Sequence, residues 1–139
     1  MAWSTPKTDW IVSDRFNITD YNRIKNNIAW LHDKAEELLK HDIEYNAMGD
    51  DISGYTGYRT AQQFNNFEEN IDIVNEAVFP RDLGETQTFY PNGAFIDYNE
   101  LNRIESASVT IKEDVDGLEA GVSNKHLAFT LGQYNSIKI

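Results

Sequence analysis

The sequence predicts a mainly α protein, a three-helix bundle with an irregular or extended N-terminal arm and C-terminal tail. Two observations carry this prediction: three segments open with the same helix-capping pattern, and heptad-like apolar spacing follows each of them. The chain has 139 residues, the size of one domain that buries about two-thirds of its unfolded surface. We therefore expect a single domain over residues 1–139, made of an arm (1–16), a helical bundle (17–118) and an extended C-terminal segment (119–139).

The three predicted helix starts share one cap pattern. The cap positions are Asn17, Thr60 and Asp97. Their side-chain oxygens can accept hydrogen bonds from the free amides of a first helical turn. Three positions further along the chain are Asp20, Gln63 and Glu100. This is capping-box spacing, close to consensus in the second copy and a variant in the other two. The pattern predicts three helix starts built in the same way.

Apolar residues then follow at alternating steps of three and four, which places them on one stripe of each helix. The first stripe is Tyr21, Ile24, Ile28, Leu31, Ala35 and Leu38, the second Phe64, Phe67, Ile71, Val74 and Val78, and the third Leu101, Ile104, Ser108, Ile111, Val115 and Leu118. We expect helices near 18–44, 60–78 and 98–116. The third is the weakest, because residues 109–111 are β-branched and Gly117 interrupts its end.

The connections read as irregular or extended chain. Residues 46–58 are rich in Gly, Asp and Tyr and predict a loop. Phe79-Pro80 ends the second helix, because proline disfavours the helical conformation of the residue before it. Residues 81–94 predict a further loop with a short extended piece over 86–90. The alternation of residues 126–131 predicts a short strand.

Composition excludes several classes of protein. With 40% hydrophobic and 25% charged residues, the chain does not resemble a disordered tail. The net charge of -11 argues against nucleic-acid binding, because phosphate contacts need clustered Lys and Arg. No run of about 18 apolar residues is present, so we expect no membrane insertion. The start of the chain carries no signal-peptide pattern. The sequence contains no cysteine, which excludes disulfides and thiol nucleophiles.

No catalytic, cofactor-binding or metal site is predicted. The chain has no nucleophile elbow, no phosphate-binding glycine loop and no zinc-protease motif. Glu37, His41 and Glu44 would share one helix face, but no second histidine stands at ligand spacing. Residues 50–54 lack the ligand pattern of a calcium loop. We therefore expect a protein that is not an enzyme, with no cofactor.

Aromatic residues outside the predicted helices are the candidate binding residues. They are Trp3, Trp10, Tyr55, Tyr58 and Tyr90. Rings on loops can stack against sugars, which makes a glycan one candidate ligand. In the other interpretation the two tryptophans fix the arm onto the bundle or onto a neighbouring subunit, because large amphipathic rings dominate interfaces. We favour this second interpretation, since burying the arm would add to a small core.

An asparagine stands at the fifth helical position of each copy. These residues are Asn22, Asn65 and Asn102. They could form a ligand-binding triad. We favour a structural role instead, in which each amide binds the backbone of a neighbouring loop and fixes how its helix enters the bundle.

Three stretches of the sequence resemble a known family. They are Thr5-Pro6-Lys7-Thr8-Asp9-Trp10, the segment 16–27 that begins Phe16-Asn17-Ile18-Thr19-Asp20-Tyr21, and the segment 90–105 that begins Tyr90-Pro91-Asn92-Gly93. They are similar to small tail, baseplate or minor structural proteins of tailed phages and prophages of Gram-positive gut bacteria. The chain departs from that pattern after Ser106. The resemblance implies a virion location, assembly in the host cytoplasm and no catalytic residues.

Together these observations lead to one functional expectation and one alternative. We expect a structural component of a phage or prophage tail or baseplate that acts through protein–protein contacts. Its expected partners are other virion tail proteins and further copies of itself, because tail components are symmetric oligomers. The resemblance favours a neighbouring subunit as the binding surface for the arm. The alternative is a carbohydrate-binding module that recognises bacterial surface glycans through loop aromatics.

Overall fold

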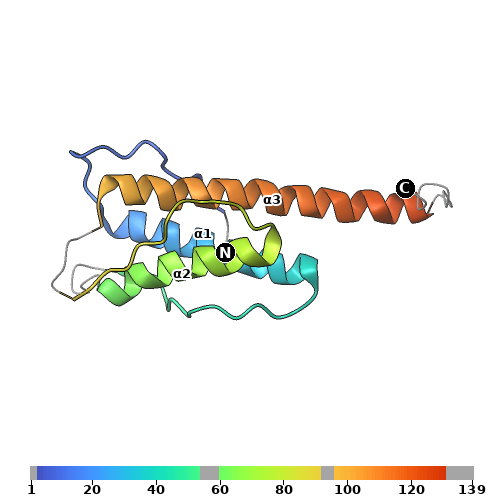
Figure 1. Cartoon of the computed structure of the whole chain (residues 1–139), viewed down its shortest axis with the longest axis horizontal. Coiled ribbons are helices and arrows are strands. Elements are labelled where there is room, and N and C mark those ends of the chain that lie inside the picture. Colours follow the sequence, from blue (N-terminus) through green and yellow to red (C-terminus); the bar gives the residue numbers. More distant parts are fainter. Residues whose placement is uncertain (1–2, 54–59, 92–95, 131–139) are drawn as a thin grey trace.

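Three α-helices packed on one another make up the bundle. The computed structural model describes residues 3–53, 60–91 and 96–130, and its helices are α1 (Ile18–Leu39), α2 (Ala61–Val78) and α3 (Tyr98–Thr130) (Figure 1). Each helix contacts the other two, and the described residues contain no strand. The prediction of a mainly α three-helix bundle is confirmed.

All three helices run in the same direction (Figure 1). Contacts at matching heights show this: Arg23 near the start of α1 binds Glu105 near the start of α3, and Lys34 late in α1 binds Glu119 late in α3. Tyr21 and Phe67, both early in their helices, pack at 5.0 Å between ring centroids. A parallel bundle requires the chain to return along the full helix length before each new helix.

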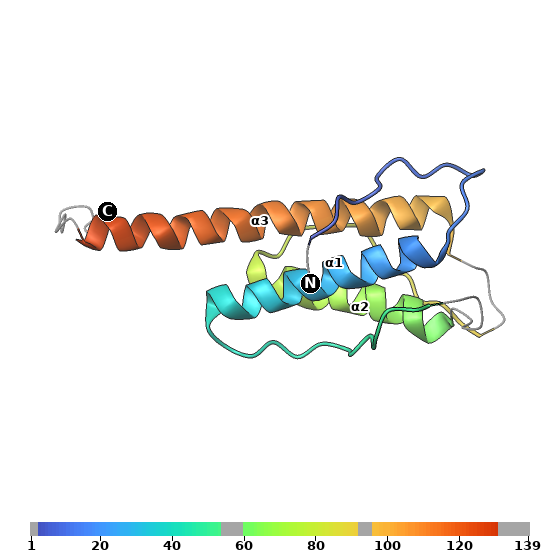
Figure 2. The same ribbon diagram turned by 180° about the vertical axis from the view of Figure 1, so that it is seen from behind.

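Three non-helical segments make these passes along the bundle. They are the arm (residues 3–16), the first return segment (residues 40–53) and the second return segment (residues 79–91). Figure 2 shows the arm on one side of α3 and the first return segment on the opposite side of the bundle. The expected loop is confirmed over residues 46–53, and the rest of it lies outside the described residues. The expected extended piece over 86–90 belongs to the second return segment.

The caps form as the spacing predicts, with one variation. Asn17 and Thr60 each accept from the amide three residues on, and the side chains of Asp20 and Gln63 bind the cap amides in return. Asp97 accepts from the Glu100 amide at 2.8 Å. The Glu100 side chain instead accepts from the guanidinium of Arg103. The third helix therefore has half of a capping box.

Two helix ends differ from the prediction. α1 ends at Leu39 rather than near 44, because Lys40 adopts a left-handed conformation (φ 59°) and its amide binds the Glu36 carbonyl oxygen. α3 continues to Thr130, so the predicted end near 116 and the predicted strand over 126–131 are wrong. Ser108 and Thr110 donate their hydroxyls to carbonyl oxygens one turn earlier, which satisfies these polar groups within the helix. The described residues contain no strand with which the alternating residues 126–130 could pair. The last part of the predicted extended segment lies outside the described residues.

The predicted apolar stripes form the core. Ile24, Ile28, Phe67, Ile104 and Val115 are almost fully buried. Ser108, the polar member of the third stripe, is also buried and satisfies its hydroxyl within its own helix. The core also takes in Trp10 from the arm and Ile43 from the first return segment. The non-helical segments are therefore part of the packed structure.

Candidate interaction surfaces

The asparagine at the fifth position of each helix binds one residue of a non-helical segment, which is the arm or one of the two return segments. In each case the side-chain amide donates to a backbone carbonyl and accepts from the amide of the same residue, at 2.7–2.9 Å. The pairs are Asn22 with Ile52, Asn65 with Phe89, and Asn102 with Trp10. We call such a pair an asparagine clamp. Because each residue is clamped through both backbone groups, the structural interpretation of these asparagines is confirmed.

Three further clamps follow the same geometry. They are Asn27 with Ser4, Asn70 with Asn46, and Asn75 with Arg81. Asn27 and Asn70 share the tenth position of their helices, where α3 has Ala107. The pattern shared by the three helix starts does not reveal Asn27 and Asn70, because the third helix has no asparagine at this position. Each of the three non-helical segments is thus clamped twice.

The arm lies on its own bundle. Trp10 is 3% exposed, and its indole nitrogen donates to Glu105 Oε2 at 2.6 Å. Trp3 is half-buried and packs on Trp30 at 5.5 Å between ring centroids. The expectation that the arm docks on a neighbouring subunit is therefore wrong for Trp10: a buried anchor of the chain's own core offers no surface to another chain.

The remaining predicted aromatic residues have different positions. Tyr55 and Tyr58 lie outside the described residues. Tyr90 is 69% exposed and directly follows Phe89, which is clamped beside the first turns of α2. Ile11 and Val12 are 56% and 82% exposed and occupy the turn between clamped Trp10 and the start of α1. Ile11 and Val12 of the arm and Tyr90 of the second return segment are thus exposed apolar residues near the helix starts; we call the end of the molecule that carries them the start-end surface.

Two buried arginine–glutamate contacts join the helices at equivalent heights. Arg23, at the sixth position of α1, binds Asp20 of its own helix and forms a bidentate pair with Glu105, the eighth residue of α3, at 2.8 and 2.9 Å. Glu105 also accepts from the Lys7 amide of the arm at 3.0 Å. This pair joins α1, α3 and the arm at one point.

Arg103 repeats the arrangement between α3 and α2. It binds Glu100 of its own helix, Glu68 of α2 and the Leu83 carbonyl of the second return segment. Glu68 Oε1 also accepts from the Gln87 amide. Burial, together with nearby Glu100, raises the pKa of Glu68 to about 9, against the opposing effect of Arg103. We infer that Glu68 keeps its proton at neutral pH.

The third equivalent place, between α1 and α2, is different. Asn66 stands at the arginine position and buried Lys25 at the glutamate position. Lys25 Nζ instead binds the Gly49 carbonyl oxygen at 3.0 Å and Asp51 Oδ1 at 2.6 Å, and Asn26 donates to the same Asp51 oxygen. Lys25 and then Asn26 lower the pKa of Asp51.

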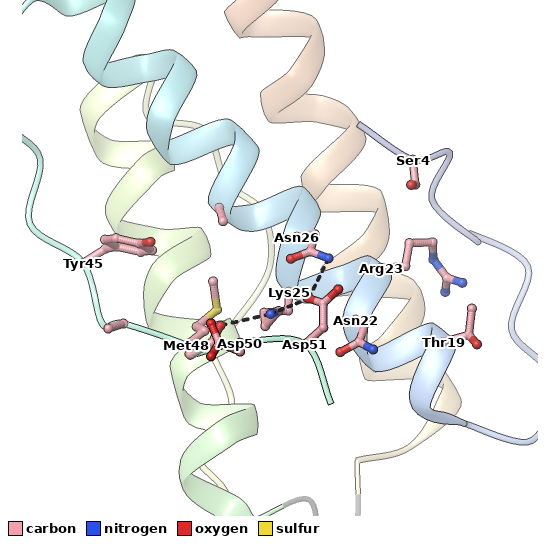
Figure 3. Close-up of a pocket in the computed structure, with 13 residues that line it drawn as sticks. Ser4, Thr19, Asn22, Arg23, Lys25, Asn26, Tyr45, Met48, Asp50 and Asp51 are labelled. Atoms are coloured by element: carbon pink, nitrogen blue, oxygen red, sulfur yellow. Dashed lines mark hydrogen bonds and ion pairs between the residues drawn. The ribbon is translucent and has the colours of Figure 1, made fainter. Parts of the chain in front are cut away.

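A polar groove of about 720 Å³ opens beside Lys25. Figure 3 shows it between α1 and the first return segment, with Lys25, Asn26 and Asp51 joined by dashed contacts. Tyr45 also lines it, with its ring stacked on His32 at 3.8 Å between centroids. The groove was not predicted from the sequence. Its local sign is Lys25, which stands at the helix position where α2 and α3 have Glu68 and Glu105.

One group of residues has metal-ligand character. His32, Asp33 and Glu36 bring their ligand atoms within 4.8 Å of one another. However, His32 Nε2 lies 2.5 Å from the Ile43 carbonyl oxygen, and Glu36 Oε2 accepts from the Ile43 amide at 2.8 Å. These bonds fix the first return segment directly after α1, which accounts for the cluster. His41 and Glu44 follow the end of α1 and do not share its face with Glu37, contrary to the sequence expectation.

None of the described helices combines the length and apolar character that a membrane span requires. Comparisons with family models, with curated proteins and with solved structures find no match to this chain.

Proposed function

We propose that this chain is a non-enzymatic structural component of a phage or prophage tail or baseplate that acts through protein–protein contacts. In this proposal it is assembled in the bacterial cytoplasm and becomes part of the virion. The observation that carries the proposal is the start-end surface, where Ile11, Val12 and Tyr90 are exposed around the helix starts. Exposed large apolar side chains gathered at one end of a molecule are candidates for a protein-binding surface.

The rest of the described structure supports an architectural role. Polar side chains that would otherwise be candidates for chemistry are engaged in holding the chain together: the asparagines clamp the return segments, and the buried glutamates bind arginines and backbone amides. The clamps at Trp10 and Phe89 tether the residues directly before Ile11 and Tyr90, and a tethered surface loses less conformational entropy on binding. The net charge of -11 keeps unassembled subunits soluble.

Incorporation into particles tests the proposal. Val12→Asp places a charge in the most exposed part of the start-end surface, and we expect it to remove the protein from purified particles while leaving its thermal unfolding unchanged. Ser13→Asp adds the same charge at the adjacent exposed position and serves as the matched control. Mass spectrometry of particles from the encoding bacterium provides the readout. Wild-type protein absent from those particles contradicts the virion role, and equal incorporation of both variants contradicts the surface.

The polar groove favours a second candidate function, glycan binding. Carboxylate and amide groups that line the same groove as a tyrosine ring suit the hydroxyl groups and the apolar face of a sugar. In this proposal Asp51, Asn26 and Tyr45 contact a bacterial surface glycan. A glycan array probed with the wild type and with Asp51→Ala tests it: binding that the substitution removes favours this function, and no binding by the wild type eliminates it.

A further inference from the structure

The middle of the second return segment lies against a buried carboxyl group. This stretch, residues 82–88, is called the strap here, and it runs between the clamped residues Arg81 and Phe89. Figure 1 shows the segment passing back along the bundle, where it contacts α2 and α3. Glu68 of α2 is 0% exposed and accepts from the Gln87 amide of the strap at 3.2 Å. The strap is therefore bonded to an ionisable group of the interior.

Arg103 of α3 holds the other half of the strap. Its guanidinium donates to the Leu83 carbonyl oxygen at 2.9 Å and also to Glu68. Gly84 has a φ of +89°, and a Cβ at this position would stand 3.0 Å from Arg103 Cδ. Glycine suits both this backbone conformation and this close approach. One arginine–glutamate contact thus binds the strap at two points, through the Leu83 carbonyl and the Gln87 amide.

The charges at this contact balance only if one carboxyl group carries a proton. Glu68 and Glu100 are both buried and share one guanidinium, that of Arg103. With both carboxyl groups ionised, an uncompensated negative charge would be buried, which is costly. Glu68 Oε2 is buried and has no hydrogen-bond partner among the described residues, so the proton belongs on Glu68. Burial and then Glu100 raise the pKa of Glu68, against the effect of Arg103, which agrees with this assignment.

Other ionisable groups meet the strap at its exposed side. Asp72, one turn after Glu68 on α2, accepts from the Thr86 hydroxyl, and Asp82 accepts from the Gly84 amide within the strap. The charged groups that act on Glu68 itself are Glu100 and Arg103, which both belong to α3. The link between the strap and a buried proton therefore runs through Glu68.

We propose that the strap is a pH-sensitive cover, which is closed on α2 and α3 while Glu68 is protonated and opens when Glu68 ionises. Opening admits water to the carboxylate, and the strap gives way before the helices because it is non-helical and is held here by two bonds. This inference does not depend on the proposed function.

The direction of the pH effect follows from proton linkage. The pKa of Glu68 is raised from 4.5 to about 9 in the closed protein, whereas an opened strap returns the carboxyl group to water. Between these values the closed state holds a proton that the open state has lost. The equilibrium constant for opening therefore rises with pH across this window, by up to about tenfold per pH unit.

Amide hydrogen exchange of the full chain, measured by NMR and corrected for the intrinsic rate at each pH, tests the proposal. We expect the opening constant of the Gln87 amide to rise about tenfold or more between pH 6 and pH 8. Glu68→Gln keeps an acceptor for this amide but has no proton to lose, so its opening constant is expected to stay constant. Glu69→Gln makes the same change at the adjacent exposed residue and, as the matched control, is expected to keep the rise.

A second variant and a second amide complete the test. Glu100→Gln removes the carboxyl group that raises the pKa of Glu68, so we expect a smaller rise than in the wild type. The Phe89 amide, bound by Asn65, reports opening beyond the strap. A Gln87 opening constant independent of pH in the wild type overturns the proposal, as does a full rise in Glu68→Gln or Glu100→Gln. Opening of Gln87 no more frequent than that of Phe89 at every pH also overturns it, because the strap would then not open by itself.

Discussion

At the scale of single residues, the asparagine clamps determine how the non-helical segments are held. A side-chain amide presents a donor group (NH2) beside an acceptor (the carbonyl oxygen), which matches the N–H and C=O of one residue in an extended segment. Asn65 uses both on Phe89, at 2.9 and 2.7 Å. Removing the amide leaves two backbone groups without their partners, which costs more than the loss of a surface contact.

Asn65→Ala is therefore expected to lower the free energy of unfolding by about 1–3 kcal/mol. Among the described residues, the neighbouring Asn66 accepts an exposed bond from Gln62, so Asn66→Ala is the matched control, with an expected change within about 0.5 kcal/mol. Chemical denaturation followed by circular dichroism measures both. Equal effects of the two substitutions would show that the clamp does not hold the second return segment.

Glu68 and Glu105 occupy the same position in their helices but have different partners. Because the pKa of Glu68 is raised to about 9 from 4.5, the native state holds a proton between these values that the unfolded state has lost. The free energy of unfolding must therefore fall as pH rises through this window. Glu105, in contrast, accepts from Arg23, Trp10 and the arm backbone.

Replacement by glutamine separates the two. Glu68→Gln imitates the protonated form, so we expect a smaller loss of stability between pH 5 and pH 9 than in the wild type, and no penalty at pH 7. Glu105→Gln removes the charge from a buried pair and is expected to cost about 2–4 kcal/mol. Thermal unfolding across the pH range gives the comparison. A wild-type pH slope that persists in Glu68→Gln would contradict the assignment.

At the scale of helices, the starts were predictable and the ends were not. A cap is a local pattern, so Asn17, Thr60 and Asp97 were identified from spacing alone. The end of α1 depends on His32 and Glu36 binding Ile43, a contact that forms only after the chain has folded back. The continuation of α3 to Thr130 had no local signal, because β-branched residues and glycine both argue against a helix.

The third cap provides a test of the repeated helix start. Asp97→Ala removes the acceptor for the Glu100 amide and is expected to destabilise the protein by about 1 kcal/mol. Asp116→Ala removes a carboxylate from an exposed pair on the same helix and should change stability by less than about 0.5 kcal/mol. Urea titrations of the two variants measure these changes in the free energy of unfolding. If Asp97→Ala is silent, the third copy of the pattern has no capping role.

At the scale of the whole molecule, the sequence predicted three helices but not their direction. An apolar stripe is buried equally well in parallel and antiparallel bundles, so periodicity carries no information on direction. The connections carried the signal. The helices are connected by residues 40–60 and 79–97. At about 3.3 Å per residue, each connection is long enough to return along a helix, whereas a connection between neighbouring antiparallel helices needs only a few residues.

The candidate surfaces were predictable only in part, for a similar reason. Tyr90 is exposed as a binding residue requires, but Trp10 is buried in the core, because composition does not say which aromatic rings the fold itself will use. Predicting the groove beside Lys25 from the sequence requires a comparison of equivalent positions in the three helices. That comparison is informative only when the contacts Arg23–Glu105 and Arg103–Glu68 are already known.

Asparagine side chains bind the non-helical segments along the sides of a parallel bundle. This arrangement leaves the ends of the bundle for contacts with partners. Amide hydrogen exchange measured residue by residue by NMR tests it most directly. The account predicts that the amides of Trp10, Ile52 and Phe89, which donate to Asn102, Asn22 and Asn65, exchange far more slowly than the amide of exposed Val12, although none lies in a helix. Exchange of these three amides as fast as that of Val12 would contradict the account.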